Sequence, residues 1–299
     1  MASVFSNTLT ELIEMAARLY GDWKSGVVDS GSTTTVVDDE REEPEDYFQN
    51  TTPASKVHIV STTDGAAPQG ETRTATDFVL TTGTVTVSTD KPFTVAPEAN
   101  DTYAILSELE WDEVKWAVNM AIKMVAKDAL EWKVDETTVV VQDDTYEYAL
   151  PTDFVWLFRV TQADGNGDFP YSIPPNQYKI IKGSTPKIHF YRFPEEMQHS
   201  GIYATDLWVN GRLSDGKALR LEGLGTPSKL ENDYDTSGVS PSYIMFQAAA
   251  LLHRKRIADP RYDSEYQRTR AEECEKLANI ERARIEAPQL PPDCKKVKD

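Results

Sequence analysis

The sequence predicts an α+β fold in which a helical core of about four helices carries two antiparallel β regions. Four segments have apolar residues at helical spacing, and two long stretches are rich in Val, Thr and aromatic residues punctuated by turn residues. No helical pattern separates the strands within either stretch, which argues against βαβ units. We expect the first stretch to form a small inserted antiparallel β-barrel or sandwich and the second an antiparallel β-meander.

Changes in composition divide the chain into parts. We expect core helices in residues 1–24 and 107–136, an acidic loop plus a Thr-rich β-insert in 25–106, an antiparallel β region in 137–222, a tether and C-terminal helix pair in 223–287, and a Pro/Lys tail in 288–299 that is disordered on its own.

Two capping boxes mark the starts of the core helices. Thr8 with Glu11 begins a helix that Gly21 ends, and Ser107 with Glu110 begins one that runs to about Trp132. Acidic residues crowd the second start: Glu108, Glu110, Asp112 and Glu113. Paired carboxylates for acid–base chemistry are one interpretation, and complementing the helix dipole is the favoured one.

The β-insert is preceded by a stretch with almost no periodicity, residues 25–56. Its acidic run, 38–46, is expected to be a surface loop or a charged rim. Metal binding by this run is the weaker alternative, because the pattern implies no coordinating geometry. The insert itself is expected in four runs, at 56–60, 77–89, 92–95 and 102–106. The second β region is expected in seven runs, at 137–141, 145–150, 154–160, 178–182, 186–192, 203–210 and 217–223.

The stretch Lys217–Arg256 reads as a strand, a Gly/Pro turn, an acidic tether and a helix that Ser240 caps and Pro241 begins. A longer, more polar helix is expected over Asp263–Ala287. Its weaker apolar side comprises Tyr266, Cys274, Leu277 and Ile280, with Cys274 expected to be buried. Such a helix is either solvated or packed on neighbouring subunits.

Charge and composition exclude several classes of protein. The net charge of −18 disfavours tight binding of the phosphate groups of nucleic acids, and the first 150 residues hold 28 acids against 10 bases. Two cysteines cannot build a disulfide framework or a zinc site, and no apolar run could span a bilayer. The start of the chain does not read as a signal peptide, so we expect a soluble protein made in a reducing cytoplasm.

No motif points to catalysis, and we expect no enzyme, no catalytic residue, no cofactor and no metal. Asp164–Asp168 starts like a calcium loop but lacks the later ligands, so a hairpin turn is expected. Gly223–Gly225 does not lead into a helix, and the four histidines are scattered.

Basic residues of the last two helices are the candidate interface with a partner. They are Arg254, Lys255, Arg256, Arg268, Arg270, Arg282 and Arg284. A protein partner is favoured over nucleic acid, because bases at a helix end also suit the dipole and an acidic partner.

The order of these parts resembles head–tail connector (adaptor or neck) proteins of tailed bacteriophages. The resemblance is carried by Asn100–Ile105, by Tyr148–Phe154, and by Leu219–Gly223 followed by Pro227, Pro241–Ile244 and Ala248–Leu252. It implies a homo-oligomeric ring, typically twelvefold, docked under the portal, with the C-terminal helix or tail reaching into it. The acidic balance suits a channel through which DNA slides without being held.

We therefore expect a structural virion protein that joins portal to tail, contacts a tail or stopper protein, lines the DNA channel and binds no membrane. The alternatives are a carbohydrate- or receptor-binding tail or surface protein that uses the β-insert, and a tail-completion or stopper protein. Deleting Asp263–Asp299 is expected to leave a soluble fold without partner docking.

Overall fold

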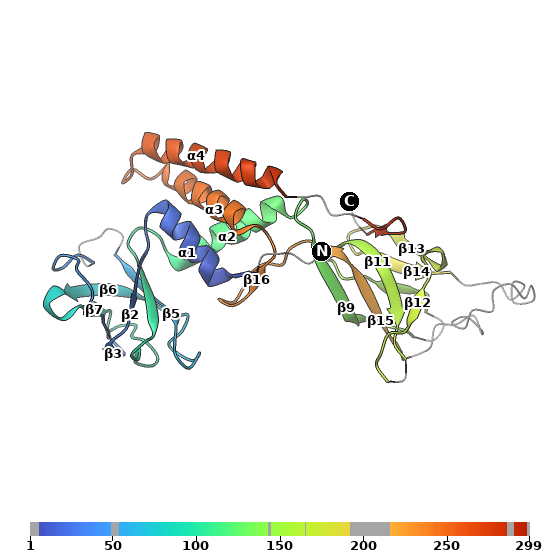
Figure 1. Ribbon diagram of the computed structural model, residues 1–299, viewed down its shortest axis with the longest axis horizontal. Helices are drawn as coiled ribbons and strands as arrows, with labels where there is room; N and C mark the ends of the chain where they lie inside the picture. The colour runs from blue at the N-terminus through green and yellow to red at the C-terminus, as the bar shows by residue number, and fades with distance from the viewer. Residues whose placement is uncertain are drawn as a thin grey trace, which may run out of the picture. The chain divides into compact units, whose positions relative to one another are not determined.

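The computed structural model describes residues 6–48, 54–142, 145–164, 166–191, 216–285 and 290–297 (Figure 1). The chain forms two compact units. One comprises residues 4–125 and 228–285, and we call it the helical unit; the other comprises 1–3, 126–227 and 286–299, and we call it the β unit. The predicted α+β class is confirmed, since the described residues contain four α-helices and several antiparallel sheets.

All four α-helices belong to the helical unit: α1 (Leu9–Tyr20), α2 (Trp111–Val125), α3 (Pro241–Arg256) and α4 (Ser264–Ala283). The first begins as predicted, with Thr8 accepting from the Glu11 N–H and the Glu11 carboxylate accepting from the Thr8 N–H. Gly21 ends it in the left-handed conformation (φ 101°). Ser240 occupies the predicted N-cap position of α3, but its side chain makes no capping hydrogen bond.

The start and the end of α2 differ from the prediction. The helix begins at Trp111 rather than after Ser107 and ends at Val125 rather than near Trp132. The carboxylate of Asp22, which follows α1, accepts the N–H groups of Ser107 (2.8 Å), Glu108 (2.7 Å) and Leu109 (2.6 Å). The segment before α2 is therefore anchored by a residue distant in the sequence, which a local capping pattern cannot reveal.

Replacing Asp22 with Ala is expected to lower the free energy of unfolding of the helical unit by about 2–3 kcal/mol, because three backbone donors lose a charged acceptor. Asp22→Asn keeps one acceptor oxygen and is expected to lose about half as much. Chemical denaturation checks this, with Asp112→Ala, an exposed carboxylate in the first turn of α2, as the matched control. Equal stability of Asp22→Ala and the control would contradict the anchoring role.

A seven-stranded antiparallel sheet forms the rest of the helical unit. Its order is β2-β8-β5-β6-β7-β4-β3. The strands are β2 (Lys24–Val27), β3 (Ser30–Ser32), β4 (Thr35–Val37), β5 (Lys56–Ser61), β6 (Thr72–Val79), β7 (Thr84–Val87) and β8 (Thr102–Leu106), with a 3₁₀ turn, η1 (Leu80–Thr82), after β6. Aromatic and branched side chains from five of these strands and the loops between them share one core, including Phe48, Phe78, Phe93 and Tyr103.

Two features of this region go beyond the sequence prediction or differ from it. Residues 25–56, which show almost no periodicity, contribute β2, β3 and β4 to the sheet, while the acidic run 38–46 lies in a loop after β4 as expected. The insert is also not a closed barrel, because β2 and β3 end the strand order and do not pair with each other in the described chain. The short Ser- and Gly-containing strands lack the alternation of apolar residues on which the sequence prediction depended.

The expected tether is fixed to the helices. β16 (Thr236–Ser237) pairs antiparallel with β1 (Asn7–Thr8), directly before α1. The Asn119 side chain on α2 bonds the Leu230 N–H at 2.8 Å and the Leu230 carbonyl at 3.1 Å. Residues 228–240 therefore hold α3 against α1 and α2.

The β unit contains two antiparallel sheets. One has the order β12-β11-β15-β9, with β17 also paired to β11, and the other has the order β10-β14-β13. The strands are β9 (Glu131–Val140), β10 (Glu147–Ala149), β11 (Phe154–Gln162), β12 (Tyr171–Ile173), β13 (Tyr178–Ile181), β14 (Lys187–Phe190), β15 (Ala218–Gly225) and β17 (Lys295–Lys296), with a 3₁₀ turn, η2 (Pro175–Gln177), before β13. A single core cluster draws on both sheets.

Several predictions for the β unit need correction. Residues 131–136 belong to strand β9, not to a helix. The order is not a meander, because the late strand β15 lies between β9 and β11. The antiparallel pairing and the hairpin turn at Asp164–Asp168 are confirmed by the pairing of β11 with β12. The strand predicted at 203–210 lies outside the described residues.

The expected disordered tail is partly structured. β17 pairs with Trp156 and Leu157 of β11, and Val297 is fully buried in the core of the β unit. Deleting Asp263–Asp299 would therefore remove a core residue from one unit and a packed helix from the other. The expectation of an intact fold after this deletion is replaced by one of destabilisation.

Candidate partner interface

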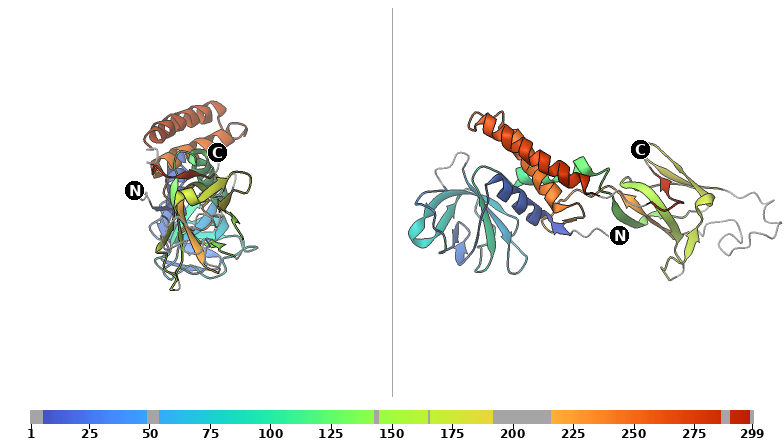
Figure 2. Two further views of the ribbon diagram at one scale, coloured as in Figure 1. Left: turned by 90° about the vertical axis from the view of Figure 1, so that its right-hand side faces the viewer. Right: turned by 45° about the horizontal axis from the view of Figure 1, so that its top comes forward.

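Helix α4 packs on α3 through small side chains. Its buried residues are Gln267, Ala271, Cys274 and Ala278. Cys274 shares a core cluster with Ala249 and Ala250 of α3, and Gln267 contacts His253 of the same helix. Figures 1 and 2 show α4 lying along α3 on the side away from α1. The burial of Cys274 is confirmed. Small residues allow close approach of the two helices, and the larger apolar residues of α4 face elsewhere.

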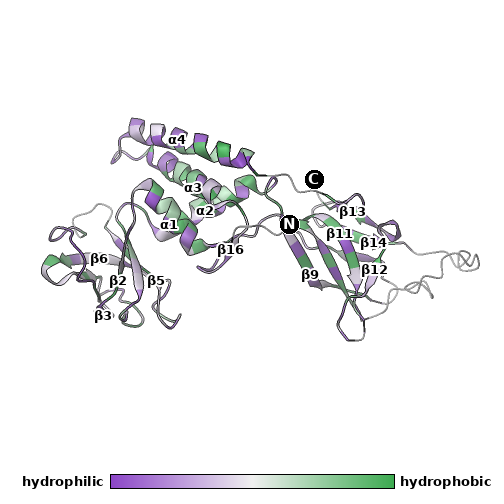
Figure 3. Cartoon of the chain, viewed as in Figure 1, coloured by the Kyte–Doolittle hydropathy of each residue, from purple (hydrophilic) through white to green (hydrophobic). Residues whose placement is uncertain are grey.

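Those larger residues are exposed. Tyr266 is 55% exposed, Leu277 42% and Ile280 51%. At 3.6 residues per turn they share an arc of roughly 60°, about a third of a turn from the buried side of α4. We call these three residues the α4 stripe. Figure 3 shows that α4 is otherwise largely hydrophilic, so these residues are an exposed apolar feature of a polar helix, and the Arg270–Glu273 ion pair lies between Tyr266 and Leu277 on the same side.

A second exposed apolar surface lies on α2. Trp116 is 47% exposed and Met124 48%, and Met120 between them is half-buried. Positions four residues apart lie above one another on a helix, so the three form one row, which we call the α2 stripe. α3 contacts both α2 and α4, so the two stripes belong to helices that α3 separates (Figure 1).

The predicted basic residues do not form one basic surface. The exposed ones form ion pairs within the chain: Arg254 with Glu275 (2.6 Å), Lys255 with Glu113 (3.0 Å), Arg268 with Glu265 (3.1 Å), Arg270 with Glu273 (2.9 Å) and Arg284 with Glu281 (2.6 Å). Arg282 is also engaged by neighbouring groups. Each of these five ion-paired charges is thus accompanied by a negative one, which weakens the predicted attraction of an acidic partner.

Arg256 is engaged within its own unit. It is buried, and its Nη2 donates to the Glu113 carboxylate at 2.7 Å and to the Glu108 carbonyl at 2.8 Å. It therefore ties the end of α3 to the start of α2. Asp112 and Glu113 lie in the first turn of α2, the position that the helix-dipole interpretation requires, and Glu113 also pairs with Arg256. Burial and the nearby Asp22 raise the pKa of Glu108.

The acidic run is also more structural than predicted. Asp38 and Arg41 are buried, and the Arg41 Nε donates to the Tyr103 hydroxyl at 2.6 Å, which donates to Asp38 at 2.8 Å. Arg41 Nη1 donates to Glu43 at 3.0 Å. The signal in the sequence was the single base among the acids of 38–46, which needs a partner if it is buried.

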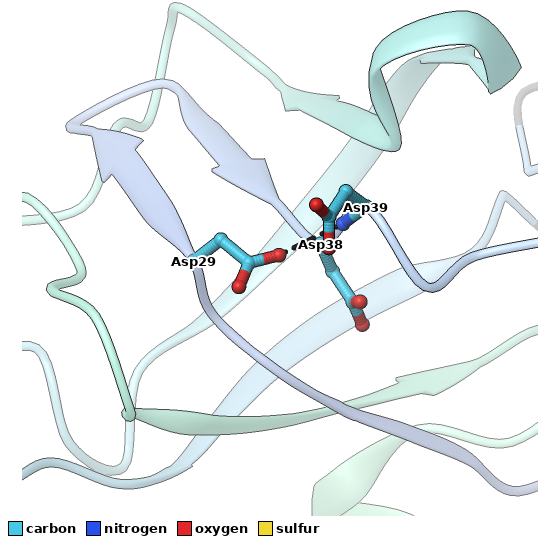
Figure 4. A group of neighbouring side chains, drawn as sticks. All are labelled: Asp29, Asp38 and Asp39. Atoms are coloured by element: carbon cyan, nitrogen blue, oxygen red, sulfur yellow. Dashed lines mark hydrogen bonds between the residues drawn. The ribbon is translucent and has the colours of Figure 1, made fainter.

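Asp29, Asp38 and Asp39 bring three carboxylates together (Figure 4). One oxygen of each lies within 4.8 Å of the others, a spacing that a cation could bridge. A hydrogen bond with Asp29 and the charge of that carboxylate raise the pKa of Asp39. Arg41 lies 3.5 Å from Asp38 and already supplies positive charge there, so a cation would compete with it.

The buried histidines pack rather than line a reactive centre. His58 stacks on Trp111 with ring centroids 3.4 Å apart, and its Nδ1 lies 2.8 Å from the Thr72 hydroxyl. His253 stacks on Tyr20, and its Nδ1 lies 2.6 Å from the Gln267 side-chain oxygen. Both side chains link elements of the helical unit.

Comparison with protein-family models finds no match, and a search of curated proteins finds no similar sequence. Within the described residues, no helix combines the length and apolar character needed to cross a membrane. The interpretation of function therefore depends on the surfaces described above.

Proposed function

We propose that this protein is a structural virion protein that forms a homo-oligomeric ring at the head–tail interface, joins the portal to the tail and lines the DNA channel. The observation that carries the proposal is the α4 stripe. A helix that buries only small residues and Gln267 against its own unit, and exposes Tyr266, Leu277 and Ile280, is suited to contact another subunit.

The α2 stripe supports a ring in particular. A cyclic assembly of more than two identical subunits uses two different surfaces, one on each side of every subunit. The α2 and α4 stripes provide two such surfaces on different helices of the same unit. The net charge of −18 also suits a channel that must not hold DNA tightly. The portal and a tail or stopper protein are the proposed partners, and the resemblance described above suggests twelve copies.

The double change Leu277→Asp and Ile280→Asp is expected to convert the ring to monomers. Two carboxylates placed in an apolar contact raise the dissociation constant by more than about 100-fold, which corresponds to a few kcal/mol. Mass photometry of the full chain, alone and with portal, measures the assembly state. The expected thermal unfolding is close to that of the wild type, because both side chains are exposed in the single chain.

Asn279→Asp is the matched control, because it adds a charge at an exposed position between the two. It is expected to assemble like the wild type. A wild-type chain that stays monomeric with portal present would refute the ring, and rings formed by the double variant would exclude the α4 stripe as the contact.

A further inference from the structure

An acidic cavity of about 810 Å³ opens at the edge of the seven-stranded sheet. It is lined by five carboxylates and one guanidinium. Residues 25–27 of β2, Val60 of β5, and Thr102 and Tyr103 of β8 also line it. The carboxylates are those of Glu14, Asp38, Glu40, Glu42 and Glu43, and the guanidinium is that of Arg41. Glu14 is paired with Arg18, whereas Glu40 and Glu42 are exposed and form no ion pair within the described part of the chain.

Three buried polar atoms of residues that line this cavity have no hydrogen-bond partner in the described structure. They are Trp23 Nε1, Arg41 Nη2 and Glu43 Oε2. Proteins rarely leave such atoms unpaired, because each costs about 1–3 kcal/mol. Two of the atoms carry N–H groups that need an acceptor, and the third is an acceptor that needs a donor. The arrangement is complementary to a ligand with both kinds of group.

Two of the side chains that carry these atoms, Arg41 and Glu43, are held in place. Arg41 is fixed by Tyr103 and by the other oxygen of Glu43, and Lys24 donates to that same oxygen at 3.3 Å. Burial opposes ionisation of Glu43, but Arg41 and Lys24 keep its pKa below the ordinary value, so its carboxylate is charged at neutral pH. Gly26 permits the packing, because a Cβ there would lie 2.1 Å from Asp38 Oδ2. The groups are therefore preorganised for a ligand.

The cavity also adjoins an open strand edge. β2 pairs only with β8 among the described strands and ends the order of its sheet, and its Ser25, Gly26 and Val27 line the cavity. In an antiparallel edge strand, alternate residues direct their N–H and C=O groups away from the sheet. Val27 is 51% exposed at this edge. An extended chain could therefore pair with β2 while its side chains and carbonyls reach the cavity.

We propose that this cavity binds an extended basic segment of a partner protein, added as a strand to the edge of β2. Carbonyl oxygens of the segment accept from Trp23 Nε1 and Arg41 Nη2, and a Lys or Arg side chain pairs with Glu43 and the exposed Glu40 and Glu42. The site lies on the sheet and not on the α2 and α4 stripes, so it is independent of the proposed ring.

Other ligands fit less well. Five carboxylates repel an anion, and Arg41 opposes a metal ion at Asp38 and Glu43. A neutral oligosaccharide could satisfy the three unpaired atoms, but it would leave the charges of Glu40 and Glu42 unused. A basic peptide is the ligand class that matches the charge, the hydrogen-bonding groups and the strand edge together.

The test uses the full chain with two labelled peptides, (Lys-Thr)4 and (Arg-Val)4, and with (Glu-Thr)4 as the acidic control. Fluorescence anisotropy is expected to show binding of at least one basic peptide and none of the acidic one. The pair of changes Glu40→Lys and Glu42→Lys, both at exposed positions, is expected to weaken binding at least tenfold. Trp23→Phe, which removes only the N–H donor, is expected to weaken it several-fold. Hydrogen exchange of the amides in residues 24–27 is expected to slow when the peptide binds.

Glu98→Lys is the control for general electrostatics, because Glu98 is exposed and does not line the cavity. It is expected to change the affinity less than twofold. The proposal is overturned if neither basic peptide binds, if Glu98→Lys weakens binding as much as the cavity variant, or if exchange at β2 is unchanged in the complex. Binding of a neutral dextran oligosaccharide at this cavity in preference to both basic peptides would also overturn it.

Discussion

Arg256→Met is expected to lower the free energy of unfolding of the helical unit by about 3–5 kcal/mol, the usual cost of removing one partner of a buried ion pair. The Arg256 and Glu113 side chains are 10% and 8% exposed, and their closest atoms lie 2.7 Å apart. Methionine preserves most of the aliphatic volume, so the loss reflects the buried Glu113 carboxylate, which keeps only the exposed Lys255 as its partner, and the Glu108 carbonyl left without its donor. Urea denaturation monitored by circular dichroism measures the change.

Two variants separate this explanation from a general effect of removing arginine. Arg254→Met, two residues earlier, breaks an ion pair whose arginine side chain is 57% exposed, and it is expected to cost about 0–1 kcal/mol. The double variant Glu113→Met with Arg256→Met removes both charges and is expected to recover much of the loss. If Arg256→Met unfolds like the wild type but fails to assemble, the residue is an interface residue after all.

The features predicted correctly from the sequence are those that depend on neighbouring residues. The capping box of Thr8 and Glu11 and the left-handed Gly21 both follow from local backbone chemistry. The sequence patterns also located all four helices, although α3 buries residues on every side rather than on one face. The number of helices and the antiparallel character of both β regions could therefore be predicted.

The incorrect predictions concern partners that are distant in the sequence. Trp132 fits a helical pattern with the residues before it, yet it pairs with Leu224 in the sheet of the β unit. The anchoring of Ser107 by Asp22 spans 85 residues, and the pairing of Arg41 with Tyr103 spans 62. No local pattern encodes these contacts, because tertiary packing overrides propensity at such positions.

The candidate interface was predicted in part. The sequence places Tyr266, Leu277 and Ile280 on the weaker apolar side of the last long helix, and the structure shows that they are exposed while Ala271 and Ala278 are buried. An apolar residue in a sequence does not indicate whether it packs inside its own chain or against another. The ion pairs of the basic residues could not be predicted for a related reason, since the partners of Arg254, Lys255 and Arg256 lie on other helices.

Acidification from pH 7 to 4.5 is expected to cost the helical unit about 2.5–3 kcal/mol through His58 alone. Burial lowers the pKa of His58 from 6.5 to about 3. The unfolded chain therefore binds a proton near pH 6.5 while the folded chain does not, so the contribution of the neutral ring is complete above pH 6.5 and falls by about 1.4 kcal/mol per pH unit below it. The loss continues until the folded ring titrates near pH 3.

His58→Phe isolates this effect, because phenylalanine can keep the stack on Trp111 but cannot take up a proton. The variant loses the contact with Thr72 and starts from a lower stability at pH 7, so the slope of stability against pH is the quantity to compare. His253 also has a pKa lowered by burial, and this group is present in both proteins. The expected result is a shallower slope for His58→Phe between pH 6.5 and 5, measured by urea denaturation. Parallel curves of stability against pH for the wild type and His58→Phe would contradict this prediction. They would show that His58 binds its proton equally well in the folded and the unfolded chain, so that burial does not lower its pKa.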